Sequence, residues 1–132
     1  MMNTPLDPWL HAEELARRLS RPGSRLIIVI GAEAWCKKCR EFRPIFEVRS
    51  RQAAPNETWL WLDMEEHAEF IGAYLPPDLP MLVCYENSDI TNLRIVEPNA
   101  SALENALTHP EADPGQKDPG LLARLMQENW AD

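Results

Sequence analysis

Two cysteines, Cys36 and Cys39, are the residues of this sequence best suited to chemistry. Thiols separated by two residues can close a small, reversible disulfide within one turn of a helix. The pair follows an apolar run at residues 26–30, and a helical pattern begins at the cysteines themselves. The free N–H groups and the positive dipole at a helix start favour a thiolate over a thiol. Cys36 is therefore predicted to be acidic and nucleophilic, and Cys39 to resolve a mixed disulfide.

The same spacing allows other uses of the two thiols. The pair could be a closed structural disulfide or an idle reduced pair, and Cys-x-x-Cys can also bind a metal. Zinc requires four ligands, usually from two such pairs or from one pair and two suitably spaced histidines. The remaining candidates are scattered along the sequence: Cys84, His11, His67 and His109. A metal site is therefore not expected.

Composition restricts the class of protein and of partner. A chain of 132 residues with 45% hydrophobic content can bury about two thirds of its surface in one core, so a single globular domain is expected. The 13 basic and 21 acidic residues give a net charge of -8. Such a charge argues against general affinity for nucleic acid or for an anionic membrane. Protein partners are expected instead.

The sequence also predicts the cellular location of the protein. Residues 1–8 lack a basic start followed by an apolar signal core. No run of the sequence approaches the roughly 18 apolar residues of a membrane span. A cytoplasmic location is therefore expected. Three cysteines, two of them in one Cys-x-x-Cys, do not make a structural disulfide framework in that reducing compartment.

Hydrophobic patterning indicates the elements that would position the cysteines. A helix that starts at Asp7 is expected to end at residues 21–23. The Ile- and Val-rich run at residues 25–31 is typical of a strand covered on both faces of a parallel sheet. The helix at the cysteines is expected to reach about Ala53 and to be kinked at Pro44.

The rest of the sequence continues the alternation of strands and helices. The expected ranges are 58–63 (strand), 65–74 (short helix), 81–85 and 91–96 (a β-hairpin), 101–108 (a helix capped at Ser101) and 118–130 (a last helix). This order predicts an α/β fold with a central mixed four-stranded sheet, helices on both faces and an extra C-terminal helix. We expect a domain at residues 1–110, and at residues 111–132 a turn-rich linker with a helix packed on or next to it.

With these elements in place, the sequence resembles the thioredoxin family. The resemblance covers about residues 26–109. It depends on three markers, which are Trp35-Cys36-x-x-Cys39 at a strand-to-helix junction, Pro44 five residues after the second cysteine, and Leu79-Pro80 at the start of a central strand.

The resemblance implies a thioredoxin-like fold and roles for individual residues. Cys36 would attack a substrate disulfide and Cys39 would release the product. The peptide bond before Pro80 would be cis and would lie against the cysteine pair, where Leu79 offers backbone hydrogen bonds to substrate. Trp35 would flank the pair as a substrate platform, although a purely packing role is the alternative.

The activity implied is thiol-disulfide exchange on protein disulfides, without a bound cofactor and with a separate reductant or oxidant to recycle the site. The contrasting hypothesis is a thioredoxin-like binding or assembly module whose cysteines turn over poorly. Cys84, in the strand after Pro80, is read as a buried apolar residue, with a regulatory thiol as the alternative.

Two lysines replace the Gly-Pro of typical thioredoxins. Lys37 and Lys38 would stabilise the Cys36 thiolate, which lowers the thiol pKa and makes the disulfide more oxidising. Alternatively, both side chains swing into water and are screened. Together with Arg40 and Arg43 they form a basic collar, which could steer an acidic partner to the site. Ordinary solvated helix charges explain the collar equally well.

Two further departures concern the proton relay. Typical thioredoxins carry a buried aspartate six residues before the first cysteine, and an aromatic residue four before it. Here these positions are Ile30 and Ala32. Glu33 lies nearby, either directed at Cys39 or solvated at the surface. The protein is therefore a slower or specialised reductant, or its site serves oxidation or a dedicated partner.

Overall fold

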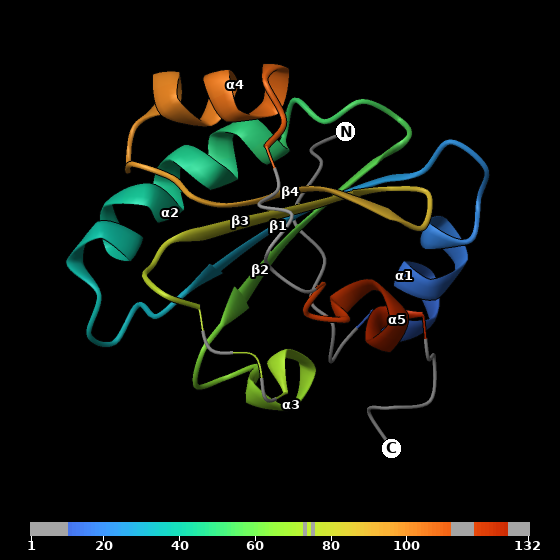
Figure 1. The fold of residues 1–132 in the computed structure, drawn as a ribbon, viewed down its shortest axis with the longest axis horizontal. Coiled ribbons are helices and arrows are strands. Elements are labelled where there is room, and N and C mark those ends of the chain that lie inside the picture. The colour runs from blue at the N-terminus through green and yellow to red at the C-terminus, as the bar shows by residue number, and fades with distance from the viewer. Residues whose placement is uncertain (1–10, 73, 75, 112–117, 127–132) are drawn as a thin grey trace.

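A four-stranded mixed sheet forms the centre of the protein in the computed structural model, which describes residues 11–72, 74, 76–111 and 118–126 (Figure 1). Its strands are β1 (Arg25–Gly31), β2 (Glu57–Asp63), β3 (Met81–Glu86) and β4 (Asp89–Ile95). The order across the sheet is β2-β1-β3-β4. β1 pairs with β2 in parallel and with β3 antiparallel, and β3 and β4 form the antiparallel hairpin. The expected sheet is confirmed.

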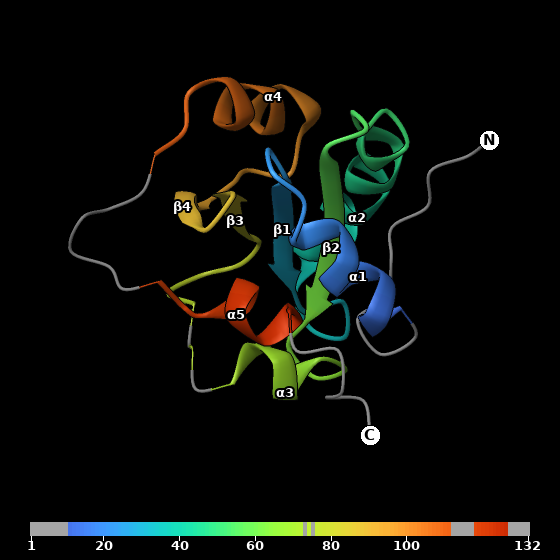
Figure 2. The same ribbon diagram turned by 90° about the vertical axis from the view of Figure 1, so that its right-hand side faces the viewer.

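Helices cover both faces of this sheet. They are α1 (Ala12–Leu19), α2 (Lys37–Ser50), α3 (Ala68–Ile71), α4 (Ala100–Thr108) and α5 (Leu121–Leu125). α2 and α4 lie over one face, whereas α1, α3 and α5 lie on the other (Figures 1 and 2). Residues 26–30 of β1 are buried throughout, as a strand covered on both faces requires.

The helix α2 packs its aromatic side chains onto β2. Phe46 lies with its ring centroid 5.8 Å from Trp59 and 5.4 Å from Trp61. Phe42 is also fully buried on this face. The helix continues through Pro44 and ends at Ser50, three residues before the expected end. Aromatic packing at these distances fixes α2, and with it the cysteines, on the sheet.

Several element boundaries differ from the expected ones. α1 begins at Ala12, and the expected start at Asp7 lies outside the described residues. α3 is a single turn instead of the helix expected at residues 65–74. α4 is capped by Asn99, whose side-chain oxygen accepts an N–H group three residues on, at 2.7 Å. The expected cap at Ser101 is therefore wrong, and Ser101 lies inside the first turn of α4. Asparagine and serine cap helices about equally well, so residue type did not distinguish the two positions.

The last described helix belongs to the lower layer in Figure 1. α5 contacts α1 and α3. Its buried side chains join the same core as the sheet, and they are Leu121, Leu122 and Leu125. The Tyr85 hydroxyl on β3 donates to the Asp118 carboxylate just before α5. The division of the chain into residues 1–110 and 111–132 stays a prediction.

Candidate dithiol site

The structure brings three chain segments to one edge of the sheet. Ile30 at the end of β1 pairs with Met81 at the start of β3, which pairs with Ile95 at the end of β4. Because these residues form one row, the segments that continue from them lie next to one another. They are the loop from β1 to the cysteines, the segment 78–80 before β3, and the residues after β4.

Backbone hydrogen bonds hold these segments. The N–H of Cys36 donates to the Ala32 carbonyl at 2.8 Å. The N–H of Val96 donates to the Pro80 carbonyl at 3.1 Å. The peptide bond between Leu79 and Pro80 is cis, as the family resemblance implied. The cysteine loop and the Leu79-Pro80 segment therefore occupy the same end of the molecule.

The two cysteines differ in their access to solvent. Their sulfur atoms are at disulfide-bonding distance and their Cα atoms are 5.2 Å apart. Cys36 is partly exposed, whereas Cys39 is 0% exposed. Cys36 is therefore the more accessible of the two to a molecule in solvent.

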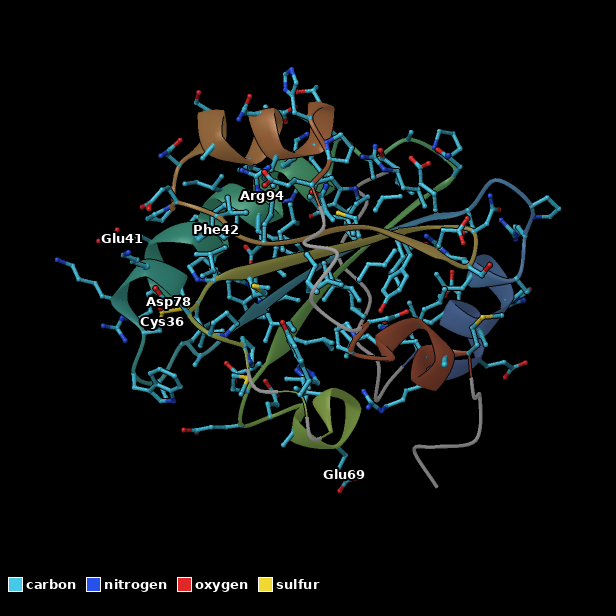
Figure 3. The ribbon with its side chains drawn as sticks, in the orientation of Figure 1. Cys36, Glu41, Phe42, Glu69, Asp78 and Arg94 are labelled. Carbon is cyan, nitrogen blue, oxygen red and sulfur yellow. A yellow bond between two sulfur atoms is a disulfide. The ribbon has the colours of Figure 1, made fainter. Side chains whose placement is uncertain are left out.

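Cys36 is also the N-cap residue of α2. Its backbone is extended, and its Sγ accepts the N–H of Cys39 at 3.2 Å. Figure 3 shows Cys36 at the start of the helix, with Phe42 further along it. The expected helix start at the cysteines is confirmed. In the reduced protein the same N–H favours negative charge on the Cys36 sulfur.

Trp35 is the most exposed of the large apolar side chains described, at 61%. Packing within this chain therefore accounts for the smaller part of its surface. Trp35 directly precedes the partly exposed Cys36 in the sequence. The backbone N–H of Trp35 donates to the Ala32 carbonyl at 3.3 Å. The indole offers a flat apolar surface to solvent on the residue before Cys36.

The two lysines between the cysteines face solvent. The Lys37 side chain is 83% exposed, and its Nζ lies 3.9 Å from the Glu41 carboxylate. Lys38 is also exposed. A carboxylate next to Lys37 reduces the positive potential that this lysine adds at Cys36. The pKa effect of the lysines on Cys36 stays a prediction, and Lys38 is the stronger candidate.

The basic collar is partly neutralised. Arg43 forms ion pairs with Glu33 at 3.3 Å and with Glu47 at 2.9 Å, and lies over the Trp61 ring. Arg40 donates to the Glu33 backbone carbonyl at 2.8 Å and keeps its charge exposed. The Glu33 carboxylate is thus engaged with Arg43 at the surface, which supports the solvated reading of Glu33.

The positions of the missing relay are buried and apolar. Ile30 and Ala32 are both fully buried. Between them, Gly31 leaves room for an indole, because a Cβ on Gly31 would lie 2.5 Å from Trp61. The interior at the end of β1 is therefore filled by aliphatic and aromatic groups at these positions.

Two aspartates near the site were missed from the sequence. Asp63 at the end of β2 accepts the N–H of Glu33 at 3.1 Å and that of Glu65 at 2.9 Å, which fixes the cysteine loop to β2. Asp78 accepts the N–H of Leu79 at 2.8 Å and is exposed. The available signals were an aspartate closing an apolar strand and an aspartate directly before Leu-Pro.

Cys84 lies apart from the site, in β3 opposite Asn92. It is fully buried, and burial raises the pKa of its thiol to about 12. A thiol of this kind is unreactive at neutral pH, which supports the reading of Cys84 as a buried apolar residue. Within the described ranges, no three His, Cys, Asp or Glu residues are grouped so that they could hold a metal ion. None of the helices described has the length and apolar character needed to cross a membrane.

No protein-family model matches the sequence, and neither does any curated protein. Solved thioredoxins do match the structure. The Fasciola hepatica thioredoxin has a TM-score of 0.59 at 19% identity, over 75% of this chain and 90% of its own. A mutant Halobacterium salinarum thioredoxin has a TM-score of 0.56 at 20% identity, over 77% and 88%. The Malassezia sympodialis thioredoxin has a TM-score of 0.51 at 22% identity, over 70% and 81%. The chain therefore has a thioredoxin-like fold, with a cysteine pair at disulfide-bonding distance.

Proposed function

We propose that this protein is a thiol-disulfide oxidoreductase that acts on protein disulfides through Cys36 and Cys39. One observation carries the proposal. The two sulfurs are within bonding distance at the start of a helix, with Cys36 reachable from solvent and Cys39 buried behind it. Such an arrangement lets one thiol meet a substrate and reserves the other for the second step.

The reaction proceeds by two exchanges. In the first, the Cys36 thiolate attacks a substrate disulfide, forms a mixed disulfide and expels one substrate thiolate. In the second, Cys39 loses its proton and its sulfur attacks Cys36, which closes the internal disulfide and expels the other substrate thiolate. The substrate disulfide gains two electrons, and the cysteine pair loses them. A separate dithiol reductant restores the pair, or an oxidant drives the same steps in reverse.

Substrate contacts are proposed for the neighbouring residues. Trp35 would provide an apolar platform, while Leu79 and Pro80 would align the substrate chain. Lys37 and Lys38 would tune the thiolate, and the exposed charges of this collar would attract an acidic segment of a partner. We propose a cytoplasmic protein in cell redox homeostasis, with no nucleic-acid or membrane partner.

The second exchange is expected to be slow. Cys39 must lose a proton before it attacks, and a general base usually accepts it. Ile30 stands at the relay position and is fully buried. Water or the departing substrate thiolate must then accept the proton, which favours long-lived mixed disulfides and a narrow set of substrates.

A second candidate is a binding or assembly module with little turnover. Ile30 and Ala32, which remove the usual relay and aromatic groups, favour it. The exposed Trp35 serves such a module equally well, because it needs only a partner surface.

Reduction of insulin by dithiothreitol separates the two candidates. The oxidoreductase accelerates the reaction, and Cys36→Ser abolishes the acceleration. Cys84→Ala is the matched control, since it removes a thiol outside the site and leaves the acceleration intact. No acceleration at any dithiol concentration, with a partner retained on the protein, would favour the module.

A further inference from the structure

Two carboxylates flank the Pro80 side of the dithiol. Asp78 lies two residues before Pro80, and Glu97 follows Val96, whose N–H binds the Pro80 carbonyl at 3.1 Å. Both side chains are exposed. None of the ion pairs formed within the described residues uses either carboxylate. Their charges are therefore available to a bound substrate.

The helix side of the site carries the opposite charge. Lys37, Lys38 and Arg40 are exposed at the start of α2, directly after or between the cysteines. β3 and β4 lie on one side of β1 in the sheet, and the two carboxylates come from the segments at their ends. Figure 3 shows Asp78 and Cys36 at the same end of the molecule. A peptide lying across the site meets cations from α2 and carboxylates from the β3 and β4 side.

The Asp78 carboxylate also forms a hydrogen bond with the backbone of Leu79, which is part of the proposed substrate site. Its Oδ1 accepts the Leu79 N–H at 2.8 Å. A substrate carbonyl that takes this N–H must displace the carboxylate. A displaced carboxylate loses a charge-assisted hydrogen bond, and a cationic substrate side chain restores one. An apolar or acidic residue at that place restores none, and a neutral polar residue restores a hydrogen bond without the opposite charge.

We propose that Asp78 and Glu97 select protein disulfides that carry a lysine or arginine beside the attacked cysteine, on the side that lies along Leu79. This inference depends on the proposed function, because it names the substrate class of the same site. It also fixes the chain direction of the bound substrate, because the basic residue must lie on the Leu79 side of the attacked cysteine.

The test uses peptides with one internal disulfide that differ in a single residue, Lys or Glu, directly before or directly after the attacked cysteine. The measured quantity is the second-order rate constant for oxidation of the fully reduced protein by each peptide. Each rate constant is divided by that of dithiothreitol with the same peptide, which removes differences in the reactivity of the disulfide itself.

The variants separate charge from shape. Asp78→Asn keeps an oxygen that accepts the Leu79 N–H and removes only the charge, and Glu97→Gln does the same at the second position. Glu69→Gln is the matched control, because Glu69 is an exposed carboxylate on α3 that points away from Cys36 in Figure 3.

At one of the two peptide positions, before or after the attacked cysteine, we expect the Lys peptide to react about tenfold faster than the Glu peptide. This ratio corresponds to one exposed ion pair with Asp78 and one with Glu97, each of which changes the rate constant about threefold. Each single substitution lowers this ratio about threefold, the double substitution abolishes it, and Glu69→Gln leaves it unchanged. High salt lowers the ratio as well.

Equal rates, faster Glu peptides, or a preference that survives the double substitution would overturn the inference alone. If neither peptide oxidises the protein, the proposed function fails and the inference fails with it.

Discussion

The backbone N–H of Cys39 lies 3.2 Å from Sγ of Cys36 and donates to it, so the Cys36 sulfur is itself the capping group of α2. This relationship links folding to chemistry. The helix that packs Phe46 onto β2 also presents its first free N–H groups to the Cys36 sulfur, which is the proposed attacking atom. Changes in the helix start should therefore alter reactivity, whereas changes in the aromatic layer should alter stability.

Titration of the reduced protein should show a Cys36 thiol with a pKa below the usual value of about 8.5. Lys38→Ala should raise this pKa, because it removes a nearby cation. Lys37→Ala should raise it less, since Lys37 pairs with Glu41. The thiolate absorbance of a Cys84→Ala background measures the effect at Cys36 and Cys39 alone. A pKa at or above about 8.5 in the parent would rule out stabilisation by the lysines.

Phe46→Ala should lower the free energy of unfolding by about 3 to 5 kcal/mol, because it leaves a cavity between Trp59 and Trp61. Urea denaturation measures the change. Val48→Ala is the control on the same helix, since Val48 is 54% exposed and its loss should cost less than about 0.5 kcal/mol. Equal losses for the two variants would contradict the packing described for α2.

Tyr85→Phe should cost about 1 to 3 kcal/mol at neutral pH, because it leaves Asp118 without the phenol donor. Burial, with the hydrogen bond to Asp118, raises the pKa of Tyr85 above its usual value of about 10. The folded state therefore holds the phenol proton more tightly than the unfolded state. That contribution is complete below about pH 10 and falls as the pH rises further.

The measurement compares urea unfolding of the parent and of Tyr85→Phe at neutral and at alkaline pH. The difference in stability between them should shrink above about pH 10. A difference that stays constant or grows with pH would show that Tyr85 does not titrate as described.

Ile30→Asp should accelerate release of the product from the mixed disulfide, because it places a base at the position where typical thioredoxins carry the relay aspartate. It should also destabilise the fold by several kcal/mol, since an ionisable group is buried in an apolar site. Ile30→Asn is the matched control, as it adds a polar group without a base. Single-turnover decay of the mixed disulfide checks the prediction, and equal decay for both variants would remove the relay argument.

The sequence was most informative where one physical effect dominated. The apolar run at residues 26–30 predicted a strand covered on both faces, and β1 is such a strand. The cysteine spacing together with Leu79-Pro80 indicated the fold and the cysteine pair at the edge of its sheet. The N-cap of α4 could not be chosen from residue type alone, because Asn99 and Ser101 are both good capping residues. Asp63 was not found, because it accepts the N–H of Glu33, which only the folded chain brings to it. Asp78 was not found, because the N–H that it accepts belongs to its neighbour Leu79, and the sequence does not fix the side-chain conformation that makes this bond.

The central claim is that the Cys36 and Cys39 pair exchanges reversibly between dithiol and disulfide. Equilibration with mixtures of reduced and oxidised glutathione, followed by alkylation of free thiols and mass analysis, tests it directly. We predict a single two-electron transition at a potential less reducing than the roughly −270 mV of thioredoxin. A pair that stays fully reduced or fully oxidised at every glutathione ratio would contradict the account.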